Sequence, residues 1–381
     1  MGKIEPVIII GGGIGGLAAA LALKRAGLEV RVFEQVASLG EVGAGLTLWA
    51  NAVKALRKLG LEDVVNSSST IDAGTIYSWQ GARLSSISSD KLLNRFGACN
   101  LAVHRSDLQY ALSAAVGPNT LTLGKTCSGV EQDDSGVQVH FSDGSTMRGS
   151  ALIGADGIHS LIRELLFGAE KPRYAGYTAW RGVTTPPLAA KIRVGEYWGR
   201  GVRFGLVPLT QGRYYWFATR NAREGEPEHQ EGRKHEVLSL FHDWYPSIPA
   251  IIEATPASAI LRNDIYDRPP LRHWTRGRIT LLGDAAHPMT PNLGQGACQA
   301  LEDALVLAYC LVQTDNTSVA LQLYQALRIP RTTRIVNRSW SLGRIGQWKH
   351  PVACLLRDTG FKWMPSSWQM ATFEEAVGHE V

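Results

Sequence analysis

The chain has 381 residues, of which 45% are hydrophobic and 19% are charged, and its formal net charge is +5. This balance is typical of a folded enzyme with a sizeable core, and it excludes a disordered or fibrous chain. The positive charges are spread along the whole length without a run of like charges, so we expect no nucleic-acid-binding arm and no nucleic-acid partner.

The N-terminal segment predicts one βαβ unit, with a strand at PVIII, a glycine-rich turn, a helix and a second strand at LEVRVFEQ. Gly11, Gly13 and Gly16 form the pattern G-x-G-x-x-G between strand and helix, and Glu34 ends the second strand. The first glycine makes the tight turn, the second lets the backbone approach a pyrophosphate, and the third lets the helix pack closely. Glu34 would accept hydrogen bonds from a ribose. The unit therefore predicts a dinucleotide site, without separating NAD from FAD.

Residues 44–116 predict the elements that follow this unit. A loop leads into an amphipathic helix, for which Asn51 is the expected N-cap. Residues 70–100 are rich in loop residues and predict short strands. The next segment predicts a strand and then a helix that we expect to be capped by Ser106 or Asp107.

Further strands follow along the chain, and after Pro172 the segments become rich in aromatic residues. Residues 137–149 predict a hairpin, and ALIGAD predicts a buried strand before a helix that begins near Ser160. After Pro172 the aromatic segments EYWGRGVRFGLVPL and RYYWFATR alternate as antiparallel strands with one buried face do. RITLLGD predicts another buried parallel strand, and a long helix follows from near Gly296. The last 60 residues are expected to be helical.

Three segments carry a family resemblance. LLGDAAHPMTPNLGQGACQALEDA resembles the GD motif, ALIGADGIHSLIR the DG motif and VHRSDLQ the arginine motif of the group A FAD-dependent monooxygenases, which have the p-hydroxybenzoate hydroxylase fold. The tail LYQALRIPR, with Arg328 and Arg331, also matches, so the resemblance spans the chain from residue 6 to about residue 331.

The resemblance implies an α/β fold with two domains and a C-terminal extension. A Rossmann-like FAD-binding domain would be built from discontinuous segments, beside a substrate domain with an antiparallel β-sheet and a helical C-terminus. We expect the FAD-binding parts at residues 1–171 and 273–331, the substrate domain at 172–272 and the C-terminal helical segment at 332–381.

The resemblance also implies which residues hold FAD. Asp284 would hold the ribityl chain, and the helix from near Gly296 would place its positive N-terminal end at the flavin pyrimidine edge. Asp156 and Gly157 would serve the pyrophosphate region and help to position NAD(P)H. Arg105 would contact FAD, although a solvated charge explains it too. Further expected neighbours of FAD are Gly15, Gln35, Thr47, Cys127, Gly294, Gln295, Ala297 and Cys298, of which Cys127 could equally be plain core.

Members of this family reduce FAD with NADPH or NADH, react it with O2 to a flavin C4a-hydroperoxide, and transfer one oxygen atom to an electron-rich substrate. The resemblance therefore implies a single-component monooxygenase that hydroxylates or epoxidises a small, fairly hydrophobic aromatic or electron-rich olefinic substrate. The protein must supply a dry cavity, and no metal is needed. The sequence has no H-E-x-x-H and no zinc-ligand spacing, so we expect no metal site.

Arg203 and Tyr215 are the candidate catalytic residues. They lie on consecutive aromatic segments, and purine-acting relatives carry Arg and Tyr at positions that resemble these. A fixed guanidinium could orient a substrate oxyanion while the tyrosine hydrogen bonds nearby, and the alternative is ordinary packing in a sheet. Asn292 stands where purine-acting relatives tend to carry aspartate, which disfavours urate and favours a less polar substrate.

Three other polar residues are better explained by a structural role than by a catalytic one. His287 could act as a proton shuttle, but a structurally anchored loop position fits it better. Glu302 and Asp303 are adjacent on a predicted helix and would point apart. We therefore assign this pair to packing or to anchoring of a loop, rather than to acid and base chemistry.

The C-terminal segment interleaves four tryptophans with basic residues, at Trp340, Trp348, Trp363 and Trp368. It could close the substrate tunnel, pair two subunits or touch a bilayer, so a monomer and a homodimer both stay open. The five cysteines are far apart, and the N-terminal apolar run is too short for a signal peptide or a membrane span. We therefore expect a cytoplasmic protein, with peripheral contact to a membrane left open.

Two other functions stay open. A reductase of an isoprenoid-type double bond can use the same fold without activating oxygen, and substrate-dependent oxygen consumption separates it from a monooxygenase. A non-catalytic FAD-binding subunit would bind FAD but would oxidise neither NADH nor NADPH with any added substrate.

Overall fold

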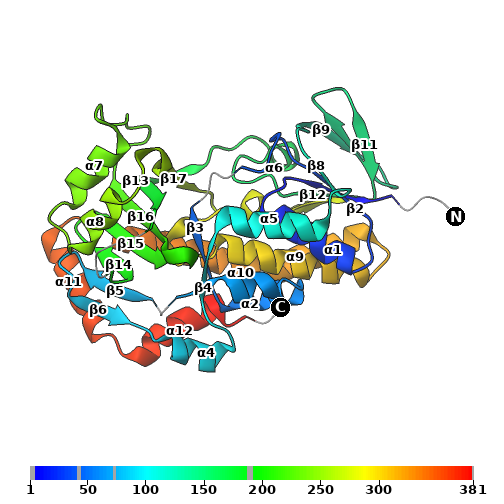
Figure 1. The fold of residues 1–381 in the computed structure, drawn as a ribbon. Coiled ribbons are helices and arrows are strands. Elements are labelled where there is room, and N and C mark those ends of the chain that lie inside the picture. The colour runs from blue at the N-terminus through cyan, green and yellow to red at the C-terminus, as the bar shows by residue number, and fades with distance from the viewer. Residues whose placement is uncertain (1–4, 41–43, 72–73, 187–191, 380–381) are drawn as a thin grey trace.

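A six-stranded sheet lies at the centre of one half of the molecule, the half that contains the N-terminus (Figure 1). The computed structural model describes residues 5–40, 44–71, 74–186 and 192–379. The strands of this sheet are β1 (Val7–Ile10), β2 (Val30–Phe33), β8 (Leu121–Thr122), β12 (Ala151–Gly154), β18 (Thr275–Arg276) and β19 (Ile279–Leu281). Their order is β18-β19-β12-β1-β2-β8, and all pairs are parallel except β18 with β19. The expected βαβ unit and the later buried parallel strands are confirmed.

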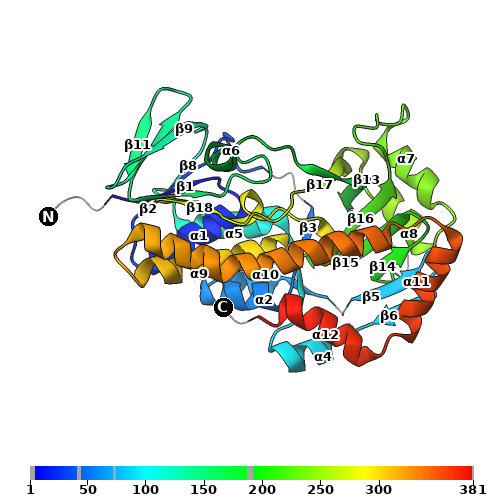
Figure 2. The same cartoon turned by 180° about the vertical axis from the view of Figure 1, so that it is seen from behind.

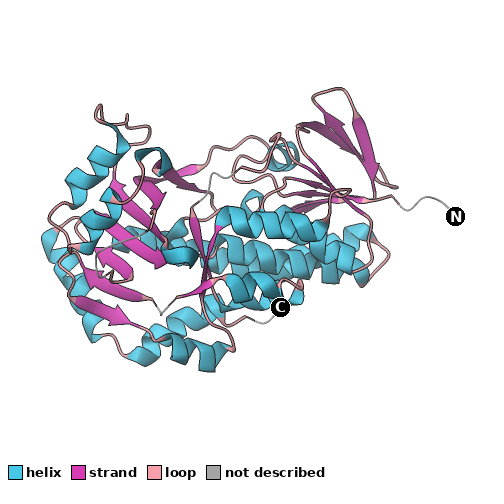
Figure 3. Ribbon diagram, viewed as in Figure 1, coloured by secondary structure: helices cyan, strands magenta, loops and turns pink. Residues whose placement is uncertain are grey.

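Three helices lie side by side along this sheet (Figure 3), namely α1 (Ile14–Arg25), α5 (Arg105–Val116) and α9 (Gly296–Val312). Every residue of β1 and β12 is buried, which explains why these strands are uninterrupted apolar runs in the sequence. The expected hairpin is confirmed within a three-stranded antiparallel sheet that joins the same core, made of β9 (Cys127–Gln132), β10 (Val137–Phe141) and β11 (Thr146–Gly149).

A seven-stranded sheet forms the other half of the molecule. Its strands are β5 (Thr75–Ser78), β6 (Arg83–Ser86), β13 (Arg173–Val183), β14 (Gly195–Trp198), β15 (Val202–Pro208), β16 (Tyr214–Asn221) and β17 (Leu261–Asp267). The order is β17-β13-β16-β15-β14-β5-β6, antiparallel except for the pair of β14 with β5. The antiparallel aromatic sheet expected after Pro172 is confirmed.

The two faces of this sheet differ because successive side chains of a strand point to opposite sides. Trp180, Phe204 and Trp216 point to one face and pack with Phe241 in a core formed by α7 (Gly232–Phe241) and α8 (Ser247–Glu253). The side chains between them point to the other face, which looks towards the six-stranded half. Short 3₁₀ turns lie at η1 (Thr210–Gly212), between β15 and β16, and at η2 (Ala257–Ala259), between α8 and β17.

A small sheet of three strands, in the order β3-β7-β4, stands between the two halves (Figure 1). Its strands are β3 (Gly45–Leu48), β4 (Ser69–Thr70) and β7 (Leu101–His104). The helices of this region are α2 (Ala50–Lys58), α3 (Glu62–Ser67) and α4 (Ser89–Phe96). The short strands expected between residues 70 and 100 are confirmed as β5 and β6.

One long helix joins both halves. Figure 2, the view from behind, shows α10 (Thr317–Gly346) running across the molecule from the six-stranded half to the seven-stranded half. It is followed by α11 (Pro351–Trp363) and α12 (Ser366–Val377), so the helical C-terminus is confirmed. No helix within the described ranges is both long and apolar enough to cross a membrane.

Two expected helix caps are wrong. Trp49, and not Asn51, precedes α2, and Asn51 turns inward as a buried residue. His104 precedes α5, because this helix begins directly where β7 ends and leaves Ser106 within its first turn. Asp107 also lies within the first turn of α5 and does not precede the helix. Helix α6 (Leu161–Phe167) begins near Ser160 as expected, and Ser160 caps it, since its hydroxyl accepts a 2.9 Å hydrogen bond from the backbone N–H of Arg163.

The domain boundaries expected at residues 171, 272 and 331 stay predictions. The seven-stranded sheet takes β5 and β6 from before residue 171. Helix α10 runs without a break across residue 331, with Pro330 inside it.

Candidate active site

The glycine-rich turn after β1 fits a bound pyrophosphate. Gly11 has φ +111°, and a Cβ there would lie 2.3 Å from the carbonyl oxygen of Ala155. A Cβ on Gly16 would lie 1.9 Å from the Gly11 oxygen, so α1 can approach β1 only with glycine there. By contrast, a Cβ on Gly13 would meet nothing within 4 Å. Open space at the N-terminus of α1 is what close approach of an anionic group requires.

Gly15 has a different role. A Cβ at this position would lie 2.8 Å from a methyl carbon of Leu282 and 3.2 Å from the Cβ of Ala300. Gly15 therefore lets α1 pack against α9, and its expected contact with FAD stays a prediction.

Glu34 lies over the same turn. Its carboxylate accepts hydrogen bonds from the backbone N–H of Gly12 at 2.6 Å and of Val36 at 3.1 Å. The amide of Gln109 on α5 donates to the Gly12 carbonyl at 2.8 Å, which fixes the turn from a second side. Gln35 follows Glu34 and is exposed.

Asp156 anchors the start of α6. Its carboxylate accepts hydrogen bonds from the Ser160 hydroxyl at 2.5 Å and from the Ile162 N–H at 3.1 Å. Burial raises the pKa of Asp156, and these hydrogen bonds oppose the shift. Gly157 has φ +79° with open space around it. Cys127 is buried close by, burial raises the pKa of its thiol, and the thiol points to the Gly129 carbonyl, as a core residue would.

A second loop, with Asp284 in η3 (Gly283–Ala285), leads through η4 (Pro291–Leu293) to the N-terminus of α9. The Asp284 side chain is exposed to an open cavity while protein surrounds it on its other sides, and no partner among the described residues hydrogen bonds to its carboxylate. Burial raises its pKa, and His287 and Arg105 oppose the shift. The first-turn amides of α9, from Gly296, have no partner within the helix and carry partial positive charge. This loop can therefore hold polar and electron-rich edges of a ligand.

Two expected cofactor neighbours in this loop turn their side chains inward. Gln295 accepts hydrogen bonds from Asn51 at 3.0 Å and from Gln299 at 2.9 Å. Cys298 is fully buried, with its sulfur 3.5 Å from the Gly294 oxygen, and burial raises its pKa to about 12. These two residues can offer only their backbone to a cofactor.

A buried network of charged side chains holds the loop from behind. Asp303 accepts a 3.0 Å hydrogen bond from the Gly283 N–H and pairs with His287 Nε2 at 2.6 Å. Arg328 donates to Asp303 and to Glu302, both at 2.6 Å. Despite burial, the pKa of Asp303 falls to about 2 because of His287 and Arg328. The anchoring role expected for His287, Glu302 and Asp303 is confirmed, whereas the bridging role of Arg328 was not predicted.

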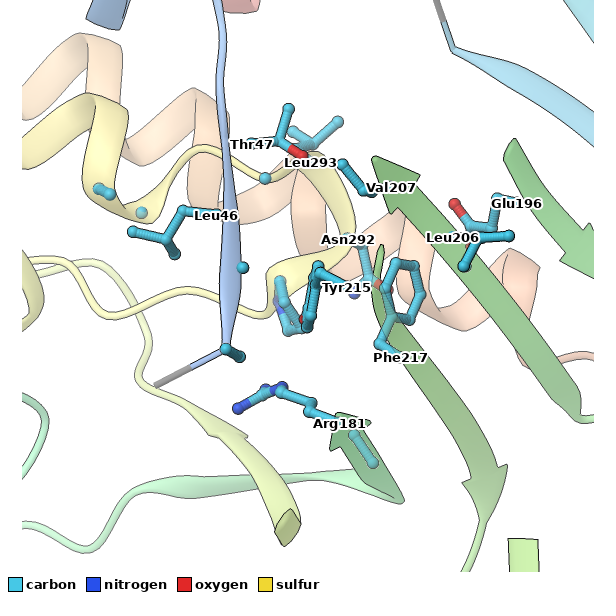
Figure 4. A pocket seen from close by; sticks show the side chains of 18 of the residues that line it. Leu46, Thr47, Arg181, Glu196, Leu206, Val207, Tyr215, Phe217, Asn292 and Leu293 are labelled. Carbon is cyan, nitrogen blue, oxygen red and sulfur yellow. The ribbon is translucent and has the colours of Figure 1, made fainter. Parts of the chain in front are cut away.

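A cavity of about 590 Å³ connects this loop to the seven-stranded sheet (Figure 4). On one side it is lined by Thr47 of β3, Arg105, Asp284 and the segments at Gly294 and Gly296–Ala297. On the other side it is lined by the alternate residues of the sheet that point away from α7 and α8, which are Ala179, Arg181, Arg203, Gly205, Val207, Tyr215, Phe217 and Thr219. The glycine-rich turn, Glu34 and Asp156 do not line this cavity.

Arg203 is buried at the polar end of the cavity, with 3% of its surface exposed. It donates hydrogen bonds to Oδ1 of Asn292 at 2.6 Å, to Glu196 at 3.1 Å and to Gln347 at 3.2 Å. Asn292 in turn donates to the Tyr177 hydroxyl at 3.0 Å. Three of the five guanidinium N–H donors are thus engaged within the described residues, and two remain for a ligand.

Tyr215 lies on the sheet side of the cavity, and its ring packs against β3. A Cβ on Gly45 of β3 would lie 2.5 Å from this ring. Burial raises the pKa of Tyr215, and the nearby Arg181 opposes the shift. Figure 4 shows Arg181 on the same side of the cavity as Tyr215 and Phe217. Sequence reasoning missed Arg181 and Glu196. The alternation that identified the sheet would have found Arg181, because Arg181 and Ala179 share one face of β13.

The family profile described as FAD binding domain matches residues 5–339. The aurachin C monooxygenase/isomerase of Stigmatella aurantiaca is 44% identical over 364 residues, which cover 94% of each chain. The 2-heptyl-3-hydroxy-4(1H)-quinolone synthase of Pseudomonas aeruginosa is 33% identical over 366 residues, with 95% of this chain and 94% of that one covered. The structure of Klebsiella pneumoniae HpxO complexed with FAD and uric acid superposes with a TM-score of 0.92 at 31% identity, over 98% of this chain and 96% of the other.

Proposed function

We propose that this chain, which belongs to the group A FAD-dependent monooxygenase family, hydroxylates a 4-quinolone-like heteroaromatic ring that carries an apolar substituent. NADPH or NADH would be the electron donor and O2 the source of the oxygen atom. The names of two relatives motivate the ring class, since one makes a 3-hydroxy-4(1H)-quinolone and the other acts as an aurachin C monooxygenase. The cavity between the Asp284 loop and the seven-stranded sheet, polar at one end and apolar along its walls, carries the proposal.

The cofactor would lie across the two loops described above. The glycine-rich turn and Glu34 would hold its adenine dinucleotide half, while Asp284, Thr47 and the α9 N-terminus would hold the ribityl and ring half. When bound, FAD supplies hydride acceptance from NAD(P)H and the activation of O2. The partial positive charge at the start of α9 favours the anionic form of the reduced ring.

Arg203 would position the substrate. Its charge is paired with Glu196, which is 26% exposed, so the pair presents hydrogen-bond donors without a strong net positive field. Such a site suits the carbonyl oxygen of a neutral ring better than a full anion, and it leaves urate a poor fit. Tyr215 and Phe217 present flat rings against which a planar substrate can pack.

The apolar part of the cavity would hold the substituent. Its lining includes Ile71, Val207, Met289 and Leu293. These side chains exclude water, which protects a reactive oxygen species from wasteful breakdown. Leu293 and Val207 face the cavity from the loop and from the sheet (Figure 4).

A substrate panel tests the proposal. FAD-loaded protein is mixed with NADH or NADPH and with 2-alkyl-4-quinolones, simple phenols, indoles, terpenoid olefins or urate, and NAD(P)H oxidation, oxygen uptake and product mass are recorded. We expect the alkylquinolones to stimulate oxidation most and to gain one oxygen atom. Saturation of an olefin without oxygen uptake would instead indicate a reductase. Bound FAD without oxidation of either donor by any substrate would indicate a non-catalytic subunit.

A further inference from the structure

Helix α11 turns its large apolar side chains towards solvent. The exposed fractions are 56% for Val352, 66% for Leu355, 67% for Leu356 and 77% for Trp363. These positions follow one another at helical spacing, with the exposed Thr359 and Gly360 between them, so they share one face of the helix. We call Val352, Leu355, Leu356 and Trp363 the α11 face.

The opposite side of α11 packs against the protein through both apolar and polar groups, with Phe361 edge-on against Trp198 at 5.0 Å between ring centroids. The buried Arg357 donates hydrogen bonds to the carbonyls of Gly199 at 3.0 Å and Gly346 at 3.2 Å. Cys354, also buried, points its thiol to the Trp348 carbonyl at 3.1 Å. These contacts fix the rotation of the helix, so the exposed apolar face is built in and does not result from fraying. An exposed contiguous apolar face of this kind indicates a binding partner.

The charges around the α11 face indicate which kind of partner it would bind. Lys349 lies just before α11 and Lys362 lies in its last turn, and both are exposed without an ion pair among the described residues. Arg344, also exposed, lies one turn earlier on α10. The one acidic residue of α11, Asp358, is held by Arg357 at 2.8 Å. The face is therefore apolar at its centre and basic at both ends.

We propose that α11 docks on the surface of an anionic lipid bilayer. Leucine and valine would enter the boundary of the acyl chains, tryptophan would lie at headgroup level, and the lysines would reach the lipid phosphates. The helix is about 20 Å long, and it lies along the edge of the molecule beside β6 (Figure 2), so it would lie in the plane of the interface.

A second apolar patch on the molecule serves as a contrast. On α9 and α10, Tyr309, Val319, Leu323 and Leu327 are between 39% and 56% exposed. The sequence from Tyr309 to Leu327 contains no lysine or arginine, so this patch lacks the charge that an anionic surface attracts. It provides a matched control for the effect of removing exposed leucines.

Trp198 lies between the buried side of α11 and the Arg203 end of the cavity. Trp198 is buried, with the guanidinium carbon of Arg357 5.1 Å from its ring and that of Arg203 5.8 Å from it. Docking would therefore hold the polar end of the cavity close to the bilayer, where apolar substrates concentrate. This consequence rests on the proposed function, but the docking itself does not.

Vesicle flotation tests the docking without any substrate. FAD-loaded protein is mixed with vesicles of phosphatidylcholine alone or of phosphatidylcholine and phosphatidylglycerol in equal parts. We expect binding to the phosphatidylglycerol vesicles that weakens as salt is added. Leu355→Gln/Leu356→Gln should lower the bound fraction at least about tenfold, because two apolar side chains no longer leave water. Lys349→Glu/Lys362→Glu should lower it to a similar extent, about tenfold or more.

The control variant Leu323→Gln/Leu327→Gln should bind the vesicles like the unchanged protein. Retained FAD absorbance and an unchanged circular dichroism spectrum show that each variant is folded. Failure of the unchanged protein to bind either vesicle overturns the proposal, as does equal loss of binding in the control variant. Concentration-dependent dimers that Leu355→Gln/Leu356→Gln abolishes, with no vesicle binding, would assign the α11 face to a second copy of the chain instead. Quinolone oxidation is measured separately, so each proposal can fail alone.

Discussion

Arg203 on β15 donates a 2.6 Å hydrogen bond to Asn292 in η4, the turn that leads into α9. This contact joins the seven-stranded sheet to the loop that carries Asp284. The geometry of the cavity therefore depends on a pair of residues that belong to different halves of the molecule.

Asn292→Leu tests this pair. The substitution keeps the side-chain volume but removes the acceptor of Arg203 and the hydrogen bonds that Asn292 donates to Tyr177 and Thr290. Because a buried guanidinium donor loses its partner, we expect kcat/KM for the best substrate to fall about tenfold to one hundredfold. FAD affinity should not change. Asn263→Leu, at an exposed position of β17 in the same sheet, is the control and should leave kcat/KM unchanged. Equal activity of Asn292→Leu and the unchanged enzyme would remove Arg203 from substrate positioning.

Gly13→Ala tests the place of the pyrophosphate. The backbone of Gly13 is extended and its Cβ position is open, so the fold should tolerate alanine, but the methyl group would stand where the cofactor approaches. We expect the FAD dissociation constant, from titration of the apoprotein, to rise at least about tenfold. Gly360→Ala, at an open position on α11, should leave it unchanged. Gly16→Ala should instead destabilise the fold itself by at least about 2 kcal/mol, because its Cβ collides with the Gly11 carbonyl.

The sequence could predict the elements that local patterns determine. The glycine turn, the start of α6 near Ser160 and the alternating aromatic strands were all found because neighbouring residues specify them. Asn51 was assigned wrongly as a cap because its partners, Gln295 and Glu302, lie 244 and 251 residues away. The setting of Arg203 could not be predicted for the same reason, since its partners come from β14, η4 and the end of α10.

Arg328→Leu tests the network behind the Asp284 loop. It leaves the buried carboxylates of Glu302 and Asp303 without their shared partner, so we expect the free energy of unfolding in urea to fall by about 3–5 kcal/mol. Arg334→Leu removes an ion pair between Glu375 and an arginine side chain that is 64% exposed. This variant should change the free energy of unfolding by less than about 1 kcal/mol. Similar losses for both variants would contradict a special role for the buried network.

The ionised carboxylate of Asp303 should make the free energy of unfolding depend on pH. Its pKa is lowered from 3.8 to about 2 in the folded protein, so the ionised carboxylate stabilises the fold above about pH 4, and this contribution is lost as the pH falls towards 2. We expect the unfolding free energy of the unchanged protein to drop by about 2 kcal/mol more over that interval than that of Asp303→Asn. Parallel pH profiles for the two proteins would show that Asp303 is not held ionised.

The most direct measurement of the proposed reaction uses dioxygen labelled with a heavy isotope. FAD-loaded enzyme, NADPH or NADH and the best alkylquinolone are incubated under this gas, and product mass and oxygen uptake are recorded together. Monooxygenation predicts a product that carries one heavy oxygen atom, with one O2 consumed for each NAD(P)H oxidised. An alkylquinolone product without the label, or a reduced product formed with no oxygen uptake, would contradict it.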